Sequence, residues 1–350
     1  ATEDYVLTVD ASGEAGWEAA GGGGASEIND LSDAKKLNTT TYGIGATALN
    51  AMSASDDGGN NLAVGYQAGG ALDAVGGNKP FGNTFIGDSA GYGTSQTGGT
   101  ANNVAIGYRA LMLHQGITNS VLVGREAGYA LTTGSDNTAL GAYSLDSATT
   151  AAGSTVVGKD AGTAITTGSN NTVVGFNGGD AITTGGQNTM LGTSAGYSTT
   201  TGSNNILLGY AAEASSATVS NEITLGSSSI SALRCQVTSI TSLSDRRDKK
   251  DIKELPIGLD FINALNPVQF TWDMRDGAKV GQKEAGFIAQ ELDEAQQDAG
   301  VEDLMNLVLK TNPDKLEATP GKLIPVLVKA IQELSSEIQT LKGNCKCQTN

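Results

Sequence analysis

The sequence predicts a mainly β protein, in which a repetitive β-solenoid rod is followed by a small α+β domain that ends in a coiled coil. Three observations predict it. An aliphatic residue followed by glycine recurs eleven times between residues 44 and 226, and from Gly107 onward these glycines are 17 residues apart. At Ser244 the composition changes abruptly, because charged residues and prolines replace glycine. An Ile/Leu heptad pattern occupies residues 324–341.

The bulk composition narrows the class of protein further. Only 39% of the 350 residues are hydrophobic and 5% aromatic, so we expect repetition or oligomerisation in place of a large conventional core. The net charge is -16 and both sides of Ser244 are acidic, which disfavours binding to nucleic acid. There is no run of 18 apolar residues and the first residues do not resemble a signal peptide. We therefore expect no membrane insertion and synthesis in the cytoplasm.

Residues 171–187 form the clearest repeat. A β-branched run bounded by Asn and Gly predicts a strand, and 17 residues leave room for two short strands and two turns, which is one coil of a solenoid. We expect the aliphatic residues before the glycines to form a continuous thin core. We expect the small residues three positions after each glycine to fit where opposite walls of the solenoid come close to each other. Asparagines at the strand starts predict amide ladders between coils: Asn61, Asn83, Asn103, Asn137, Asn171, Asn188 and Asn205.

Two other interpretations of the repeat are disfavoured. A calcium-binding solenoid requires a period of nine with aspartate ligands, and low-complexity disorder requires no fixed period at all. Residues 41–229 resemble instead the head repeats of trimeric bacterial adhesins, a left-handed β-roll built on Asn-Ser/Thr-x-aliphatic-Gly-x-x-Ala, and similar stretches of phage tail fibres. The resemblance implies that three rolls assemble into a parallel homotrimer.

The rest of the chain divides by composition. Residues 1–40 form a connecting segment, with one strand at residues 5–10, Trp17 as an anchor and the flexible joint Gly21–Gly24. The β-roll repeats span 41–229 and a β connector spans 230–243. We expect a chaperone or peptidase domain at 244–322, a trimerising coiled coil at 323–342 and a tail at 343–350.

Helical signals begin after Ser244. Residues 284–292 predict a strand or turn that leads into a helix, and residues 323–342 predict a long helix. Its core positions alternate between Ile and Leu: Ile324, Leu327, Ile331, Leu334, Ile338 and Leu341. This alternation favours a parallel dimer, which conflicts with a trimer. Fewer than three heptads do not fix the oligomeric state, so the rest of the assembly decides it.

The sequence contains no pattern that predicts a cofactor or metal site. The three cysteines, Cys235, Cys345 and Cys347, lack the spacing of a zinc site or a disulfide framework, so free thiols are expected. His114 is the only histidine and lies in a repeat loop, which favours a surface position over a catalytic one.

Ser244 stands at the compositional boundary. Alone, the charged run 245–254 indicates a solvated helix start with Ser244 as its N-cap. However, Ser244-Asp-x-x-x-Lys249-x-x-Ile is followed by Leu-Asn-Pro-Val-Gln-Phe-x-Trp at 265–272, by Gly-Phe-Ile-Ala-Gln-Glu at 286–291 and by the heptads. This series of motifs, over 244–342, resembles the C-terminal intramolecular chaperone domain of phage tail spikes and fibres of the endosialidase type, which also occurs in the myelin regulatory factor.

The resemblance implies a serine peptidase that cuts itself once, after three chains have assembled. It assigns Ser244 as the nucleophile, Lys249 as the general base and Leu243–Ser244 as the scissile bond. Neutral lysine is a competent base for serine. Neighbouring Arg and Lys side chains favour its neutral form, whereas the neighbouring aspartates oppose it. Because five residues separate Ser244 from Lys249, a bend or a neighbouring subunit must bring them together.

The sequence therefore predicts a virion subunit: a phage tail fibre, assembled in the host cytoplasm, that attaches to the host. Expected partners are two further copies, a glycan or outer-membrane receptor, and the phage tail or a larger fibre at the N-terminus. The alternatives are a bacterial trimeric adhesin, a glycan-degrading tail spike, a membrane-tethered transcription factor and a chaperone-type fibre tip that is never cut. An adhesin would need a membrane-anchoring barrel. A glycan-degrading spike would need two carboxylates in a groove with aromatic platforms. A transcription factor would need a basic region and a membrane helix.

Overall fold

The computed structural model describes residues 5–9, 15–19, 34–36, 40–52, 58–72, 79–94, 99–236, 242, 244–275, 277 and 279–346. The chain divides into two compact units, Ala1–Ser227 and Ser228–Asn350, and each is described by itself. Trp17 lies within a described strand, whereas Gly21–Gly24, Leu243 and Cys347 lie outside the described residues.

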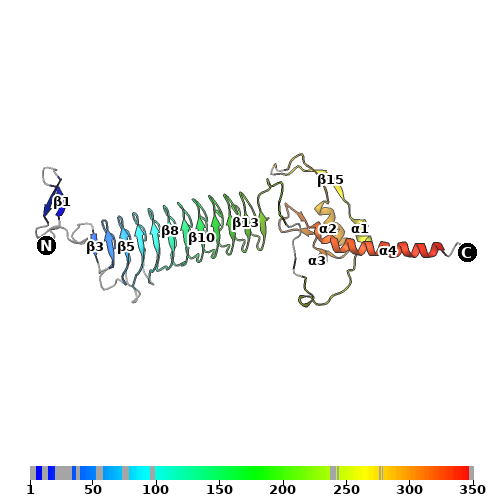
Figure 1. Ribbon diagram of the computed structural model, residues 1–350, viewed down its shortest axis with the longest axis horizontal. Coiled ribbons are helices and arrows are strands. Elements are labelled where there is room, and N and C mark those ends of the chain that lie inside the picture. The colour runs from blue at the N-terminus through cyan, green and yellow to red at the C-terminus, as the bar shows by residue number, and fades with distance from the viewer. Residues whose placement is uncertain are drawn as a thin grey trace. The chain divides into compact units, whose positions relative to one another are not determined.

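The first unit is a parallel β-solenoid. Eleven three-residue strands pair with their neighbours in chain order, and Figure 1 shows them stacked one beside the next along the rod. An additional strand, β3 (Ala34–Lys36), pairs antiparallel with β4, and β1 (Tyr5–Val9) forms a separate hairpin with β2 (Ala15–Ala19). The parallel strands are β4 (Tyr42–Ile44), β5 (Leu62–Val64), β6 (Thr84–Ile86), β7 (Val104–Ile106), β8 (Val121–Val123), β9 (Thr138–Leu140), β10 (Thr155–Val157), β11 (Thr172–Val174), β12 (Thr189–Leu191), β13 (Ile206–Leu208) and β14 (Ile223–Leu225).

Each coil that is described in full contains one strand, not the two that the repeat length predicted. The remainder of each coil consists of turns, because the glycine after each strand takes a conformation that ends the strand. Gly175 has φ +147°, and a Cβ there would lie 2.2 Å from the carbonyl oxygen of Gly192 in the next coil. A side chain is excluded both by the backbone angle and by the closeness of the coils. The strict glycine period is therefore a condition of stacking.

The core of the rod lies one residue earlier than predicted. The strand-centre residue points inward and packs on the small-residue column and on an aliphatic column from the turn; Val156, Ala161 and Ile165 of one coil are all fully buried. The residues before the glycines face outward instead, and Leu191 remains 51% exposed. The prediction was wrong because successive residues of a strand point to opposite faces, so two adjacent aliphatic residues cannot both be in the core.

The asparagine ladder is confirmed. Asn83 Nδ2 donates to Asn61 Oδ1 at 2.9 Å, and Asn103 Nδ2 donates to Asn83 Oδ1 at 3.0 Å. Serines replace asparagine in two coils, and Ser120 continues the chain of hydrogen bonds by donating its backbone N–H to Asn103 Oδ1 at 3.0 Å. These side chains are buried, and each satisfies backbone groups of the neighbouring coil, which a buried amide requires.

His114 is buried, contrary to the surface position that was predicted. Its Nε2 lies 3.1 Å from the Gly91 carbonyl oxygen, and its Nδ1 lies 3.4 Å from the Thr100 hydroxyl. Since a carbonyl only accepts, Nε2 carries the proton and the ring is neutral. Burial lowers its pKa to about 4, although the hydrogen bond to Gly91 opposes that shift. The residue is a structural part of the rod.

The second unit is a small α+β domain. Its core brings together Phe261, Leu292, Leu307 and Val326. The elements are η2 (Arg246–Asp248), α1 (Leu259–Ala264), β15 (Val268–Thr271), β16 (Lys283–Gly286), α2 (Ala289–Asp298), α3 (Glu302–Met305), β17 (Val308–Leu309), β18 (Glu317–Ala318), η3 (Pro320–Leu323) and α4 (Ile324–Lys346). The predicted strand that leads into a helix is confirmed as β16 and α2, and the long terminal helix is confirmed as α4.

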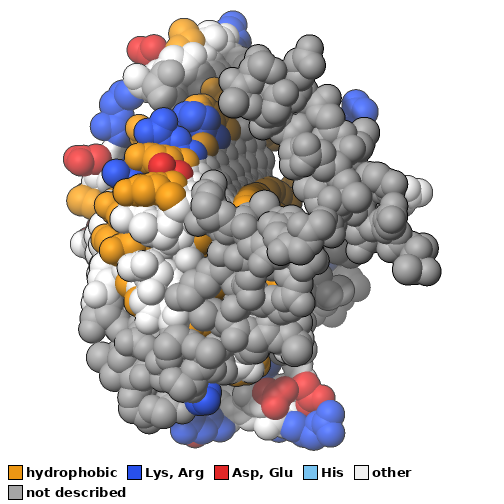
Figure 2. All heavy atoms as spheres, turned by 90° about the vertical axis from the view of Figure 1, so that its left-hand side faces the viewer, with side chains coloured by type: hydrophobic (Ala, Val, Ile, Leu, Met, Phe, Trp, Pro, Cys, Tyr) orange, Lys and Arg blue, Asp and Glu red, His pale blue; other side chains and the backbone are white. Residues whose placement is uncertain are grey.

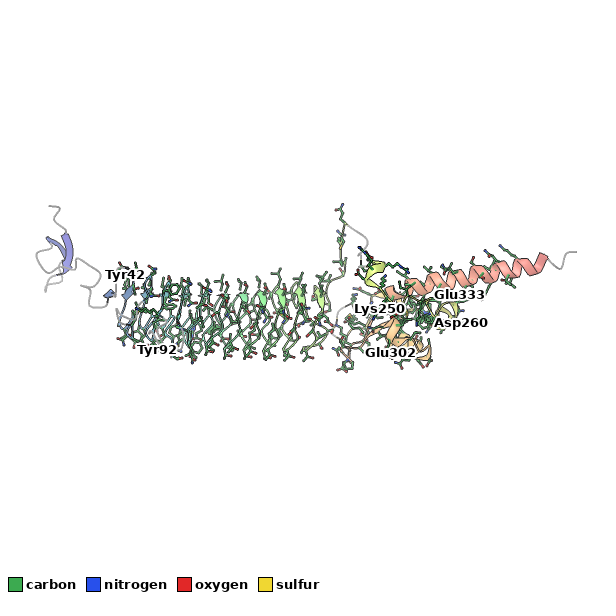
Figure 3. The ribbon with its side chains drawn as sticks, turned by 90° about the horizontal axis from the view of Figure 1, so that it is seen from below. Tyr42, Tyr92, Lys250, Asp260, Glu302 and Glu333 are labelled. Carbon is green, nitrogen blue, oxygen red and sulfur yellow. The ribbon has the colours of Figure 1, made fainter. Side chains whose placement is uncertain are left out.

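Helix α4 has two apolar faces. Val326 and Ala330 are buried against the domain, whereas all six heptad residues, from Ile324 to Leu341, are 42–67% exposed in the single chain. Glu333 connects the helix to α1, because its Oε2 accepts from the backbone N–H of Leu259 at 2.7 Å. Figure 3 labels Glu333 and Asp260 at this junction. One face of α4 thus packs against the domain, and the other is exposed in the single chain.

Candidate functional site

The predicted pair of Ser244 and Lys249 is brought together within one chain by a tight turn. The turn is η2, a single turn of 3-10 helix in which Asp248 N donates to Asp245 O and Lys249 N to Arg246 O, both at 3.2 Å. The backbone returns to an extended conformation at Lys249 (φ −125°, ψ 136°). A straight strand or helix would separate these two side chains. Of the two expected arrangements, a bend or a neighbouring subunit, the single chain shows the bend, which is η2.

Asp245 shapes this turn. Its carboxylate accepts the backbone N–H of Arg247 at 2.8 Å, which is an N-cap, and also pairs with the guanidinium at 2.7 Å from Nη2 and 3.1 Å from Nε. The side-chain hydrogen bond from Arg247 holds the pKa of Asp245 below its usual range. The cap is one residue later than the N-cap indicated by composition alone. The Ser-Asp pair before a charged run was the signal for it, since Asp is a favoured N-cap.

The Oγ of Ser244 and the Nζ of Lys249 are 2.6 Å apart. This is within the distance at which a proton can pass directly between a nucleophile and its base. Both side chains are exposed in the single chain. Chemically, a serine hydroxyl in this arrangement can pass its proton to a neutral lysine.

A separate cavity of about 700 Å³ lies in the second unit between α1, α2 and α4. Apolar side chains such as Phe261 and five carboxylates line it: Asp260, Glu291, Glu294, Asp298 and Glu333. Neither Ser244 nor Lys249 contributes to its walls. The Ser244–Lys249 pair is therefore not part of this cavity.

Other site chemistry is limited. Across the described part of the chain, no group of three His, Cys, Asp or Glu side chains is placed to hold a metal ion. Cys235 is a free, exposed thiol. None of the described helices is long and apolar enough to cross a membrane.

Residues 244–301 match the family model described as chaperone of endosialidase, Peptidase S74. The match begins at Ser244, the first residue of the pair. Neither the curated proteins nor the solved structures include a match to this chain. A parallel β-solenoid rod in the same chain as an endosialidase-type chaperone segment is consistent with a phage tail fibre or tail spike that carries its own chaperone.

Proposed function

We propose that this chain is a tail fibre subunit whose C-terminal domain assembles three chains in register and then cuts itself off between Leu243 and Ser244. The observation that carries the proposal is the 2.6 Å contact between Ser244 Oγ and Lys249 Nζ at the first residue of the chaperone match. A serine and a lysine this close form the minimal set for nucleophilic attack on a peptide bond.

The reaction proceeds in two steps. Neutral Lys249 takes the Ser244 hydroxyl proton while Oγ attacks the carbonyl carbon of Leu243. As the C–N bond breaks, the lysine returns the proton to the Ser244 nitrogen, and residues 1–243 are held as an ester on Oγ. Water then hydrolyses the ester, which leaves a carboxylate on Leu243 and restores the serine hydroxyl. The products are residues 1–243 and residues 244–350.

In this proposal, assembly of three chains buries the Ser244–Lys249 pair, which is exposed in the single chain. Ser244 and Lys249 are exposed, so water solvates the lysine ammonium and cleavage is slow before assembly. The exposed heptad face of α4 provides the contact that joins three chains through Ile and Leu side chains. Burial of the pair between chains favours the neutral lysine. Cleavage thereby follows assembly.

The repeats of the rod explain why assembly should precede cleavage. From Gly107 to Gly226 every coil has the same 17-residue length, so copies displaced by one coil would still meet similar side chains. Parallel β pairing between distant residues is also slow to fold and prone to aggregation. A C-terminal domain that aligns three chains sets their register, and its removal leaves a fibre that cannot disassemble by the same route.

Host attachment is the role proposed for the released fibre. The rod would bind a glycan or outer-membrane component of the host surface, and the N-terminal segment would join it to the phage tail or a larger fibre in the virion. This part rests on the architecture of a rod with a chaperone segment, and fold alone does not establish function. Deletion of residues 41–229 should abolish binding to host cells if the rod carries the receptor site.

The peptidase is tested with the full-length chain, Ser244→Ala and Lys249→Ala. After trimers form, denaturing electrophoresis and mass spectrometry should show fragments 1–243 and 244–350 for the wild type alone. Both variants should remain full length yet trimeric. A wild-type trimer that stays uncut contradicts the peptidase and leaves a chaperone-type fibre tip that is never cut.

A further inference from the structure

The outward face of the solenoid sheet carries an apolar surface along the whole rod. It consists of the first and third residues of strands β4 to β14, which are half-buried or exposed on every strand, whereas the second residue is turned inward. The third position is aliphatic in all eleven strands. We refer to these two columns as the sheet stripe. In Figure 3, Tyr42, the first residue of the stripe, lies on the upper edge of the rod, an edge that faces right in Figure 2. The hydrophobic and basic side chains on the left of Figure 2 lie on another flank.

We propose that the sheet stripe is the surface through which the rods of parallel copies of this chain pack against one another. This inference rests on the trimer proposed above and identifies which face of each rod lies inside it. Charged side chains do occur on the rod, such as Asp88, Arg125 and Lys159, but none of them stands in the stripe. An uncharged surface with one continuous aliphatic column is typical of the buried centre of an interface, not of a solvated surface.

A second copy fits this surface better than a receptor does. Strands of one rod repeat at about 4.8 Å, and a parallel copy has the same spacing, so the side chains of every coil meet equivalent side chains. The first column changes from aliphatic at Val121 to threonine from Thr138 to Thr189 and back to aliphatic at Ile206. Copies in register therefore place like residues together, aliphatic against aliphatic and threonine against threonine.

The stripe is large enough for a stable interface. Two side chains on each of eleven strands give 22, and a standard interface of about 800 Å² per partner requires only about 36 Å² from each. Leu191 and Leu225, at 51% and 53% exposure, offer that area readily. The α4 helices of the same copies hold the chains parallel, as the stripe requires.

The test compares two cysteines of one coil. In full-length chains with the native cysteines changed to serine, Leu191→Cys lies in the stripe, at 51% exposure. Tyr197→Cys, at 49%, is the matched control, because it occupies the same place in its coil as Tyr92. Figure 3 shows Tyr92 on the opposite edge of the rod from Tyr42, which begins β4. A bismaleimide with a spacer on the order of 10 Å spans the usual distance between packed sheets.

One linker joins two of three subunits, so Leu191→Cys should convert about two thirds of the chains to a covalent dimer, and Tyr197→Cys should give none. An antiparallel pair would fail this test, since Leu191 is on the ninth of eleven parallel strands and would lie roughly 29 Å from its equivalent. Sedimentation measures whether the chains are trimers or monomers, and so distinguishes a failure of the interface proposal from a failure of the trimer proposal. Trimers that link through Tyr197→Cys, or through neither cysteine, overturn the interface alone, whereas monomers overturn the proposed trimer as well.

Discussion

His114 should make the stability of the rod depend on pH between 7 and 4. Its pKa is about 4 in the folded chain and 6.5 without burial, so the unfolded chain binds the proton more readily in that range. A lowered folded pKa means that stability is complete above pH 6.5 and is lost as the pH falls toward 4. Integration over this window gives a loss of about 3 kcal/mol at pH 4.

The assay is urea denaturation of the wild type and of His114→Gln at pH 7 and pH 4, followed by circular dichroism. Titrating carboxylates affect both proteins equally, so the informative quantity is the difference between their losses. Wild type should lose about 3 kcal/mol more per chain than the variant, because glutamine does not titrate. Equal losses in the two proteins would refute the burial of a neutral imidazole against Gly91 and Thr100.

Three further changes test other parts of the structure. Asp245→Ala removes the N-cap of η2 and should slow cleavage severalfold in electrophoretic time courses, whereas Asp245→Asn keeps the acceptor and should cleave at the wild-type rate. Equal rates in the two variants contradict the positioning role. Gly175→Ala places a Cβ 2.2 Å from the Gly192 carbonyl oxygen and should lower the rod's melting temperature by more than Ala181→Gly does. Gln296→Leu leaves the buried Leu307 N–H without its 2.8 Å acceptor and should cost the C-terminal unit about 1–3 kcal/mol in chemical denaturation, so an unchanged midpoint contradicts that bond's role.

The repeat was predictable because each coil must have the same backbone conformation as the coil on which it stacks. From Gly45 to Gly192, each glycine that ends a strand approaches the next coil too closely for a side chain, so the sequence must repeat wherever the backbone does. The buried asparagines were predictable for a related reason, since their amides satisfy the same backbone groups in successive coils. Long-range order of this kind appears in the sequence as periodicity.

The side that each residue faces was harder to predict. Val173 and Val174 are both aliphatic, yet only Val173 is buried, and a pattern of two adjacent apolar residues does not show which one points inward. The second aliphatic residue lies on the outer face of the sheet, which is the surface proposed above to pack against other copies. His114 was misplaced for a similar reason: its partners, Gly91 and Thr100, are supplied by other parts of the coiled chain.

The proximity of Ser244 and Lys249 required the structure. A spacing of five does not by itself bring two side chains together, and only the turn capped by Asp245 does so. The motif series indicated the residues but gave no geometry. Resemblance thus selected the pair, and local backbone conformation explains how one chain brings them within 2.6 Å.

The most direct test of assembly-coupled cleavage is to refold the full-length chain at several concentrations and to follow trimer and fragment 244–350 in the same samples. The trimer should form first, and the fragment should appear after it, with a rate that rises steeply with concentration because three chains must meet. Release of the fragment from monomers at the same rate at every concentration, or a trimer that never releases it, would contradict the account.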